Sequence, residues 1–137
     1  MAEQKYLKTH FGIIDKLDKN KDYAASLGAE FKKFECALSY YGCVPFDNDL
    51  LDCWYPEVMN MEVHYYKYGN RGMGIYPYGI NLIPPESLSK FKEIIKNSDY
   101  SNVPIIFTYN GKSLIDCMIE LISEAELQNK FIIHFGV

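Results

Sequence analysis

Features common to secreted and membrane proteins are missing from this sequence of 137 residues. No apolar run approaches the ~18 residues that indicate a transmembrane helix. The first ten residues, MAEQKYLKTH, lack the apolar core of a signal peptide. We therefore expect a cytoplasmic protein that does not bind a membrane.

Sequence signatures of catalysis and of metal binding are also missing. The four cysteines include no CxxC pair, and the three histidines do not recur at the spacing of metal ligands. G-x-S-x-G and H-E-x-x-H, which mark hydrolases with a serine nucleophile or a zinc ion, do not occur. The sequence therefore predicts no cofactor, no metal site, no catalytic residue and no enzymatic activity.

Two short segments come close to known ligand-binding motifs. DKNKDYAASLGAE begins like a calcium loop, but Tyr23 stands where that loop needs Gly and Ala29 where it needs Glu. TYNGKS resembles the end of a phosphate-binding loop, but Ile106 occupies the position of its first Gly. We expect neither segment to bind its ligand. The first should instead cap a helix through Asn20 or Asp22.

The composition favours one folded domain with a large aromatic content. Apolar residues make up 48% of the chain, which is enough to bury a core without disulfides, so residues 1–137 are expected to form a single globular domain. Twelve tyrosines and eight phenylalanines enrich either that core or an interface. The net charge of −4 argues against binding to nucleic acid, which requires clustered Lys and Arg.

Hydrophobic periodicity predicts an α+β fold. Helices are expected over 6–17, over 22–41 with a stop at Gly42, from Pro85 onward, and from a Ser113 cap to about Leu127. Strands are expected over 58–68 and 73–83, joined by the turn GNRG, and over 103–109 and 130–137, while 43–56 is expected to be irregular. We predict about four helices on a mixed sheet of four or five strands. A central hairpin over 58–82 and a C-terminal strand-helix-strand unit with a right-handed parallel crossover complete this fold.

Acidic residues gather in two blocks. The first lies between Pro45 and Tyr66, where Lys and Arg are missing, and its members are Asp47, Asp49, Asp52, Glu57 and Glu62. The second consists of Asp116, Glu120 and Glu124, which fall four residues apart and so form one ridge on the predicted last helix. That ridge should lie opposite the apolar residues Leu114, Met118, Leu121 and Ile122.

These blocks are either solvated surfaces or the binding site of a basic protein. Aromatic residues are interleaved with the first block, and such residues often anchor interfaces. The predicted partner-binding residues are Asp47, Asp49, Asp52, Trp54, Tyr55, Asp116, Glu120 and Glu124.

With its small size, the segments FDNDLLDCWY and DCMIELISE, and the missing catalytic motifs, the chain resembles the small acidic immunity proteins that neutralise bacterial polymorphic or contact-dependent growth-inhibition toxins. The resemblance implies a tight one-to-one complex with a toxin domain, often a cationic nuclease. We accordingly predict a non-enzymatic immunity protein whose partner is a basic toxin domain and not nucleic acid.

Two alternatives belong to other classes of function. His64 and His134 could act as base and acid in an enzyme that cleaves RNA or acts on a nucleotide. Only Lys67 and Arg71 lie near His64 in the sequence, whereas a site for RNA should be flanked by more cations. The second alternative is an adaptor subunit of a larger complex.

Overall fold

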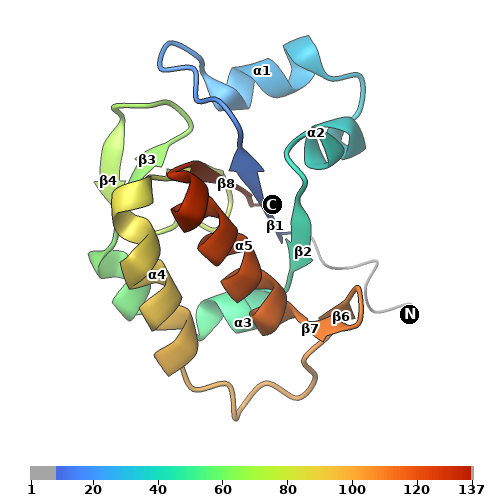
Figure 1. Cartoon of the computed structure of the whole chain (residues 1–137), viewed down its shortest axis with the longest axis vertical. Coiled ribbons are helices and arrows are strands. Elements are labelled where there is room, and N and C mark those ends of the chain that lie inside the picture. Colours follow the sequence, from blue (N-terminus) through green and yellow to red (C-terminus); the bar gives the residue numbers. More distant parts are fainter. Residues whose placement is uncertain (1–8, 137) are drawn as a thin grey trace.

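The computed structural model describes residues 9–136 and is built on a six-stranded sheet (Figure 1). Its strand order is β2-β1-β8-β5-β3-β4, and the neighbouring strands pair in antiparallel fashion. The strands are β1 (Thr9–Ile14), β2 (Val44–Phe46), β3 (Glu62–Tyr65), β4 (Arg71–Met73), β5 (Ile80–Ile83) and β8 (Phe131–Phe135). A separate small hairpin consists of β6 (Thr108–Tyr109) and β7 (Lys112–Ser113).

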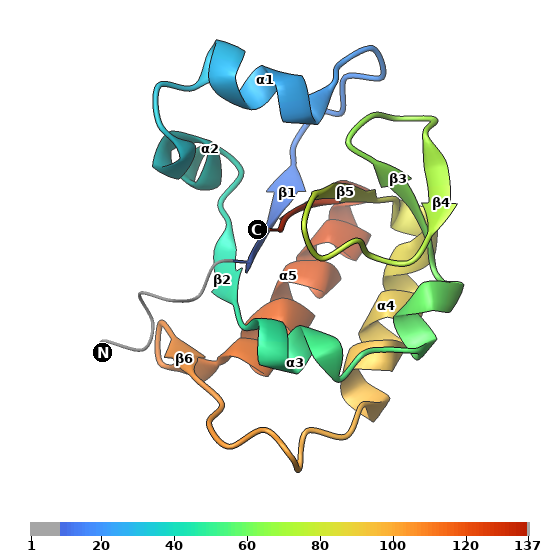
Figure 2. The ribbon, with the colours of Figure 1, turned by 180° about the vertical axis from the view of Figure 1, so that it is seen from behind.

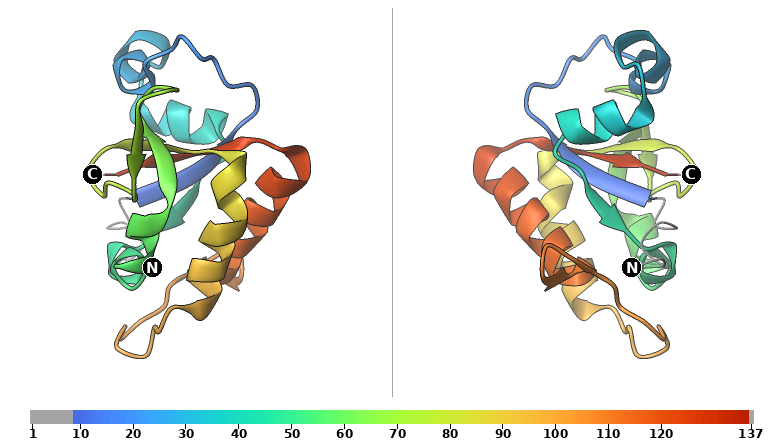
Figure 3. Two further views of the ribbon diagram at one scale, coloured as in Figure 1. Left: turned by 90° about the vertical axis from the view of Figure 1, so that its left-hand side faces the viewer. Right: turned by 90° about the vertical axis from the view of Figure 1, so that its right-hand side faces the viewer.

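Helices cover both faces of this sheet. They are α1 (Tyr23–Glu30), α2 (Phe34–Tyr40), α3 (Asn48–Asp52), α4 (Pro85–Asn97) and α5 (Leu114–Gln128), and residues Glu57–Asn60 form the 3-10 turn η2. Figure 3 shows α1 and α2 on one side of the strands and α4 and α5 on the other. The predicted α+β class is confirmed. Within residues 9–136, no helix is long and apolar enough to cross a membrane.

Strand β8 shows how the two faces divide the core. Ile132 packs in the cluster that holds the buried residues of α4 and α5, whereas Ile133 and Phe135 pack in the cluster of Tyr23 and Tyr41 beside α1 and α2. Successive side chains of a strand point to opposite faces, so both faces of β8 need apolar residues. This accounts for the continuous apolar run FIIHF, which predicted a strand here.

The helix predicted over 6–17 is wrong. Residues 9–14 form β1, between β2 and β8, while residues 6–8 lie outside the described part of the chain. A Cβ at Gly12 would come within 2.6 Å of the Cys43 Sγ atom and 2.7 Å of the Tyr41 carbonyl oxygen. Gly12 therefore permits the close approach of β1 to the chain that follows α2.

The single helix predicted over 22–41 is two helices. Asp22 caps α1, and its carboxylate accepts hydrogen bonds of 2.9 Å from the N–H groups of Ala24 and Ala25. The backbone then becomes extended at Phe31, whose ring packs against Tyr40. Gly42 follows α2 with a φ of +60°, which confirms the predicted stop.

The predicted central hairpin is present, but its turn lies over 66–70 and not over GNRG, since Arg71 and Gly72 belong to β4, and its strands also differ. Tyr65 N–H donates to the Asn70 carbonyl oxygen at 2.8 Å where β3 turns into β4. Residues 57–60 form η2 instead of a strand, and residues 74–79 leave the sheet before β5 pairs with the other edge of β3.

The strand predicted over 103–109 is wrong except at its last two residues. Ile105 and Ile106 are 55% and 39% exposed, and residues 103–107 form no strand. Strand β8 pairs with β1 on one side and with β5 on the other, both antiparallel, so the described chain contains no parallel crossover. Helices α4 and α5 are confirmed, the latter with Ser113 as its cap.

Candidate protein-binding surface

Helix α3 carries the first acidic block. Asp47 is its N-cap and accepts a hydrogen bond of 3.1 Å from Asp49 N–H. Leu50 and Leu51 are buried beneath the helix, which leaves Asp49 and Asp52 exposed on its outer side. The alternation of acidic and apolar residues in DNDLLD thus produces one buried and one negatively charged side.

Four carboxylates gather around the half-buried Cys53. Burial raises the pKa of its thiol, and the negative charges of Asp52, Asp99, Asp49 and Asp47 raise this pKa further. Asp47 is affected in the same way, because burial and then the charges of Asp49 and Asp52 raise its pKa above the usual value. We call Asp47, Asp49, Asp52 and Asp99 the acidic cluster.

Asp99 was not among the predicted site residues. It follows α4 and lies 47 positions after Asp52 in the sequence, and the fold of the chain brings it to Cys53. Both Cys53 and Asp99 line a groove of about 570 Å³ that also contains Glu57, Glu93 and Lys90. The Nζ atom of Lys90 donates to the Asn60 carbonyl oxygen at 2.8 Å, so the groove contains one cation among several acids.

The acidic cluster takes no part in the ion pairs found among residues 9–136. Those pairs lie elsewhere, and they are Lys21 with Glu30, Lys92 with Glu126, Lys112 with Glu120, and Lys130 with Asp15. The cluster therefore has no ion-pair partner within residues 9–136, and the one cation in its groove, Lys90, donates to the Asn60 carbonyl oxygen.

Helix α5 carries the second block as predicted from its spacing. Asp116, Glu120 and Glu124 are exposed, and Leu114, Met118, Leu121 and Ile122 are buried on the opposite side. We call these three acids the acidic ridge. It borders a groove of about 300 Å³ whose other side includes Val44 of β2 and Tyr109 of β6.

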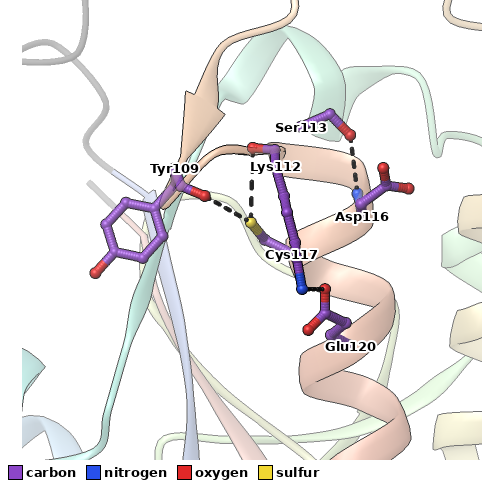
Figure 4. A network of polar contacts seen from close by, with 6 residues as sticks. All are labelled: Tyr109, Lys112, Ser113, Asp116, Cys117 and Glu120. Carbon is purple, nitrogen blue, oxygen red and sulfur yellow. Dashed lines mark hydrogen bonds and ion pairs between the residues drawn. The ribbon is translucent and has the colours of Figure 1, made fainter.

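The β6–β7 hairpin is fixed to the start of α5 (Figure 4). The Ser113 hydroxyl oxygen accepts a hydrogen bond of 3.1 Å from Asp116 N–H, and Cys117 Sγ–H donates to the Tyr109 carbonyl oxygen at 3.4 Å. Lys112 forms an ion pair with Glu120. The acidic ridge is thus partly neutralised at its centre.

The two acidic blocks are carried by helices that lie apart. Figures 1 and 2 are opposite views along one axis and superpose α3 on the first turn of α5, whereas both views of Figure 3 show the two helices separated. Asp116 belongs to that first turn. The acidic cluster and the acidic ridge are therefore two separate charged areas.

The two predicted aromatic anchors, Trp54 and Tyr55, differ in how far they are buried. Trp54 is fully buried, its ring stacks on Phe46 with a centroid distance of 4.9 Å, and its Nε1–H donates to the Tyr100 hydroxyl at 3.0 Å. The prediction that Trp54 contacts a partner is therefore wrong, because the ring belongs to the core. Tyr55 is half-buried, and its hydroxyl donates to the Ile75 carbonyl oxygen.

The two histidines of the alternative enzyme lie on opposite faces of the sheet. His64 is paired with Leu82, which is paired with Ile133, so these three side chains share one face. His134 follows Ile133 on β8 and therefore points to the other face. His64 and His134 cannot act together as base and acid on one substrate.

Each of these histidines also has a structural partner. The Nδ1 atom of His134 accepts a hydrogen bond of 2.8 Å from the Asn81 side-chain amide, and burial lowers the pKa of His134 to about 3. The Nδ1 atom of His64 accepts a hydrogen bond of 2.8 Å from Gly69 N–H, and burial lowers the pKa of this ring as well.

Potential metal ligands are not grouped in the described residues. Between residues 9 and 136, no group of three or more His, Cys, Asp or Glu side chains is arranged to hold a metal ion. Because Asp22 caps α1, at least one oxygen of the calcium-like segment has a local role. The absence of a calcium site and of a cofactor stays a prediction.

Comparisons with known proteins give one structural similarity. No protein-family model matches the chain, and no curated protein sequence matches it. Among solved structures, the chain is similar to the Neisseria DNA mimic protein DMP12, with a TM-score of 0.47 and 15% sequence identity over 93% of this chain and 98% of that one. The predicted partners, a basic toxin domain and no nucleic acid, are corrected in part by this finding, since the similar protein is named as a mimic of DNA. The resemblance to immunity proteins stays a prediction.

Proposed function

We propose that this chain is a non-enzymatic protein-binding protein whose acidic cluster and acidic ridge occupy the nucleic-acid-binding surface of a partner protein. The observation that supports it most is the gathering of Asp47, Asp49, Asp52 and Asp99 around Cys53, outside the ion pairs of the described chain. A surface that binds phosphates presents Lys and Arg, and the carboxylates of this cluster can pair with both.

The spacing of the acidic ridge fits this proposal. Residues four apart on a helix are separated by a rise of about 6 Å, which is close to the separation of successive phosphates along a nucleic-acid strand. Asp116, Glu120 and Glu124 stand at this interval along α5, and since Lys112 pairs with Glu120, Asp116 and Glu124 carry the negative charge that remains for a partner.

The placement of Asp52 and Glu124 does not help folding. Asp52 is the last residue of α3, where the negative end of the helix dipole disfavours a carboxylate. Each pair of like charges four residues apart on α5 lowers the stability of the helix by about 0.2 to 0.5 kcal/mol. Exposed acids whose placement opposes folding support a role in binding. Immunity to a toxin would be one case of this function, in which the partner is a nuclease.

Competition with DNA tests the proposal. The immobilised protein is exposed to a lysate, and captured proteins are identified by mass spectrometry with and without a double-stranded oligonucleotide. The triple variant Asp49→Asn, Asp52→Asn, Asp99→Asn removes charge from the acidic cluster. The matched control Asp18→Asn, Glu35→Gln, Glu86→Gln removes the same charge from exposed acids outside both blocks.

We expect nucleic-acid-binding proteins to be captured, to be displaced by the oligonucleotide, and to be lost with the cluster variant but not with the control variant. Capture that is unaffected by DNA, or lost equally with both variants, would contradict the proposal. Capture of no protein at low salt would contradict it as well.

A further inference from the structure

A second surface feature is a groove of about 340 Å³ between η2, β4 and the chain that follows β4. We call it the Met-Tyr groove, and its lining includes Asp52, Tyr55, Met59, Tyr65, Met73 and Tyr76. Three of these side chains are largely exposed, with Met59 at 47%, Met73 at 49% and Tyr76 at 56%. Exposed Met and Tyr side chains close together are typical of binding surfaces, because Met adapts its shape and Tyr buries a large area.

The groove is formed without a ligand. The Tyr65 hydroxyl lies 2.9 Å from the carbonyl oxygens of both Met73 and Gly74, and the Tyr55 hydroxyl donates to the Ile75 carbonyl oxygen. These bonds fix three successive residues of the backbone. Gly74 has a φ of +88°, and a Cβ at this position would lie 2.5 Å from the Met59 sulfur. Met59 therefore packs directly on the backbone at Gly74.

One end of the groove is negatively charged. Asp52 lines it and also belongs to the acidic cluster, so the apolar groove and the cluster are continuous. Asp52 takes no part in the ion pairs among residues 9–136. A ligand that fills this groove would gain from a cation placed next to its apolar side chain.

We propose that the Met-Tyr groove binds a segment of the partner protein in which a large apolar side chain lies next to Lys or Arg. The apolar side chain packs against Met59 and Met73, and the cation pairs with Asp52. A guanidinium group can in addition lie over the exposed ring of Tyr76. This inference rests on the proposed function and adds an apolar contact, since nucleic acid itself would not fill such a groove.

Methyl NMR of methionine tests the inference without the partner. The probe is an acetylated pentapeptide Gly-Arg-Phe-Arg-Gly, and the comparison peptides are Gly-Arg-Ala-Arg-Gly and Gly-Glu-Phe-Glu-Gly. The methyl signals of Met59 and Met73 are assigned with Met59→Leu and Met73→Leu. The buried Met61 and Met118 serve as internal references.

The first peptide should shift the Met59 and Met73 signals saturably, with a Kd of roughly a millimolar, as expected for one small anchor. Binding should be roughly tenfold weaker for the alanine peptide, and the Asp52→Asn variant should weaken binding of the first peptide roughly fivefold. The acidic peptide should not bind. Absent shifts, or equal shifts with all three peptides, would overturn the inference.

Failure of this experiment can be told from failure of the proposed function. If the peptides do not bind but DNA still displaces captured proteins, the acidic blocks bind and the Met-Tyr groove does not. If the arginine and phenylalanine peptide binds but capture is unaffected by DNA, the groove is a binding site and the nucleic-acid-binding partner is wrong.

Discussion

Trp54 and Tyr55 are neighbours in the sequence, and burial gives them different roles. Trp54 lies in the core against Phe46, whereas Tyr55 forms part of the Met-Tyr groove. The acids of α3 differ in the same way, because Asp47 is half-buried as a helix cap while Asp49 and Asp52 face solvent. The residue types in FDNDLLDCWY therefore did not show which of its side chains are buried and which are accessible to a partner.

His134 should make stability depend on pH. Its pKa is about 3 in the folded protein, because burial, with a smaller effect of the neighbouring His10, disfavours the charged ring. In the unfolded chain the pKa is close to 6.5, so between these values the unfolded state binds more protons. The contribution of neutral His134 to the free energy of unfolding is complete above pH 6.5 and is lost as the pH falls toward 3. The free energy of unfolding should fall by up to about 1.4 kcal/mol per pH unit in this range.

Urea denaturation from pH 7 to pH 4 measures this loss, and His134→Gln should make the dependence shallower. A proton NMR titration gives an independent test that does not require a folded variant. The imidazole signals of His134 should stay constant between pH 8 and pH 5, and a midpoint near 6.5 would show that the ring is not neutral and buried.

At the scale of elements, the sequence predicted the helices and strands whose hydrophobic pattern and end signals indicate the same structure. Helices α4 and α5 have one apolar face and a clear start, at Pro85 and at Ser113, and strand β8 has an unbroken apolar run. Strand β1 was missed because THFGII buries residues on both faces of the sheet, so neither the alternation of a strand nor its burial is visible in the pattern. The apolar segment 103–107 was mistaken for a strand because its sequence does not reveal that β8 already has two neighbours.

The candidate site was predicted in part for similar reasons. Local spacing was enough to place the acids of α5 in an exposed row, whereas residues 43–56, expected to be irregular, form β2 and α3. The position of Asp99 beside Cys53 and the apposition of η2 with β4 are contacts between distant parts of the chain. A sequence without aligned homologues gives no signal for such contacts.

We expect the acidic ridge of α5 to lower the stability of the protein and to strengthen binding of the partner. In Glu124→Lys, the new cation lies four residues after Glu120 and replaces a like-charge pair with a favourable one in the preferred order. We expect the free energy of unfolding to rise by about 0.5 kcal/mol, measured by urea denaturation, while capture of the DNA-displaceable partner decreases. The exposed Glu35→Lys serves as the control for a change of charge on another helix. Lower stability with unchanged capture would contradict this account of the ridge.

At the scale of the whole molecule, the sheet separates structural and binding residues. Buried polar groups such as His134 and Asn81 lie within the sheet, where they bond to each other. The acids of α3 and α5 and the Met-Tyr groove lie outside it, and the groove adjoins the acidic cluster through Asp52 (Figure 2 shows α3 next to η2). The chain has a net charge of only −4, so the distribution of charge, more than its total, defines this surface.

This arrangement predicts separate kinetic roles for the two parts of the surface. Exposed charges accelerate association by steering, and buried apolar anchors slow dissociation. With a partner identified by DNA competition, Asp49→Asn, Asp52→Asn, Asp99→Asn should slow association roughly tenfold at low salt, and less at moderate salt because the charges are then screened. Met59→Ala with Tyr76→Ala should instead raise the dissociation rate roughly tenfold with little dependence on salt.

Surface plasmon resonance at two salt concentrations measures both rates, and the variant Asp18→Asn, Glu35→Gln, Glu86→Gln controls for net charge. The groove variant truncates half-exposed side chains, one of which packs on Gly74, so its melting temperature is measured to show that the variant is folded at the temperature of the assay. If the cluster variant alters dissociation alone, its acids are buried in the complex and do not steer. If the groove variant alters neither rate, the partner contacts the acidic blocks and leaves the Met-Tyr groove open, because an anchor buried in the complex cannot be removed without faster release.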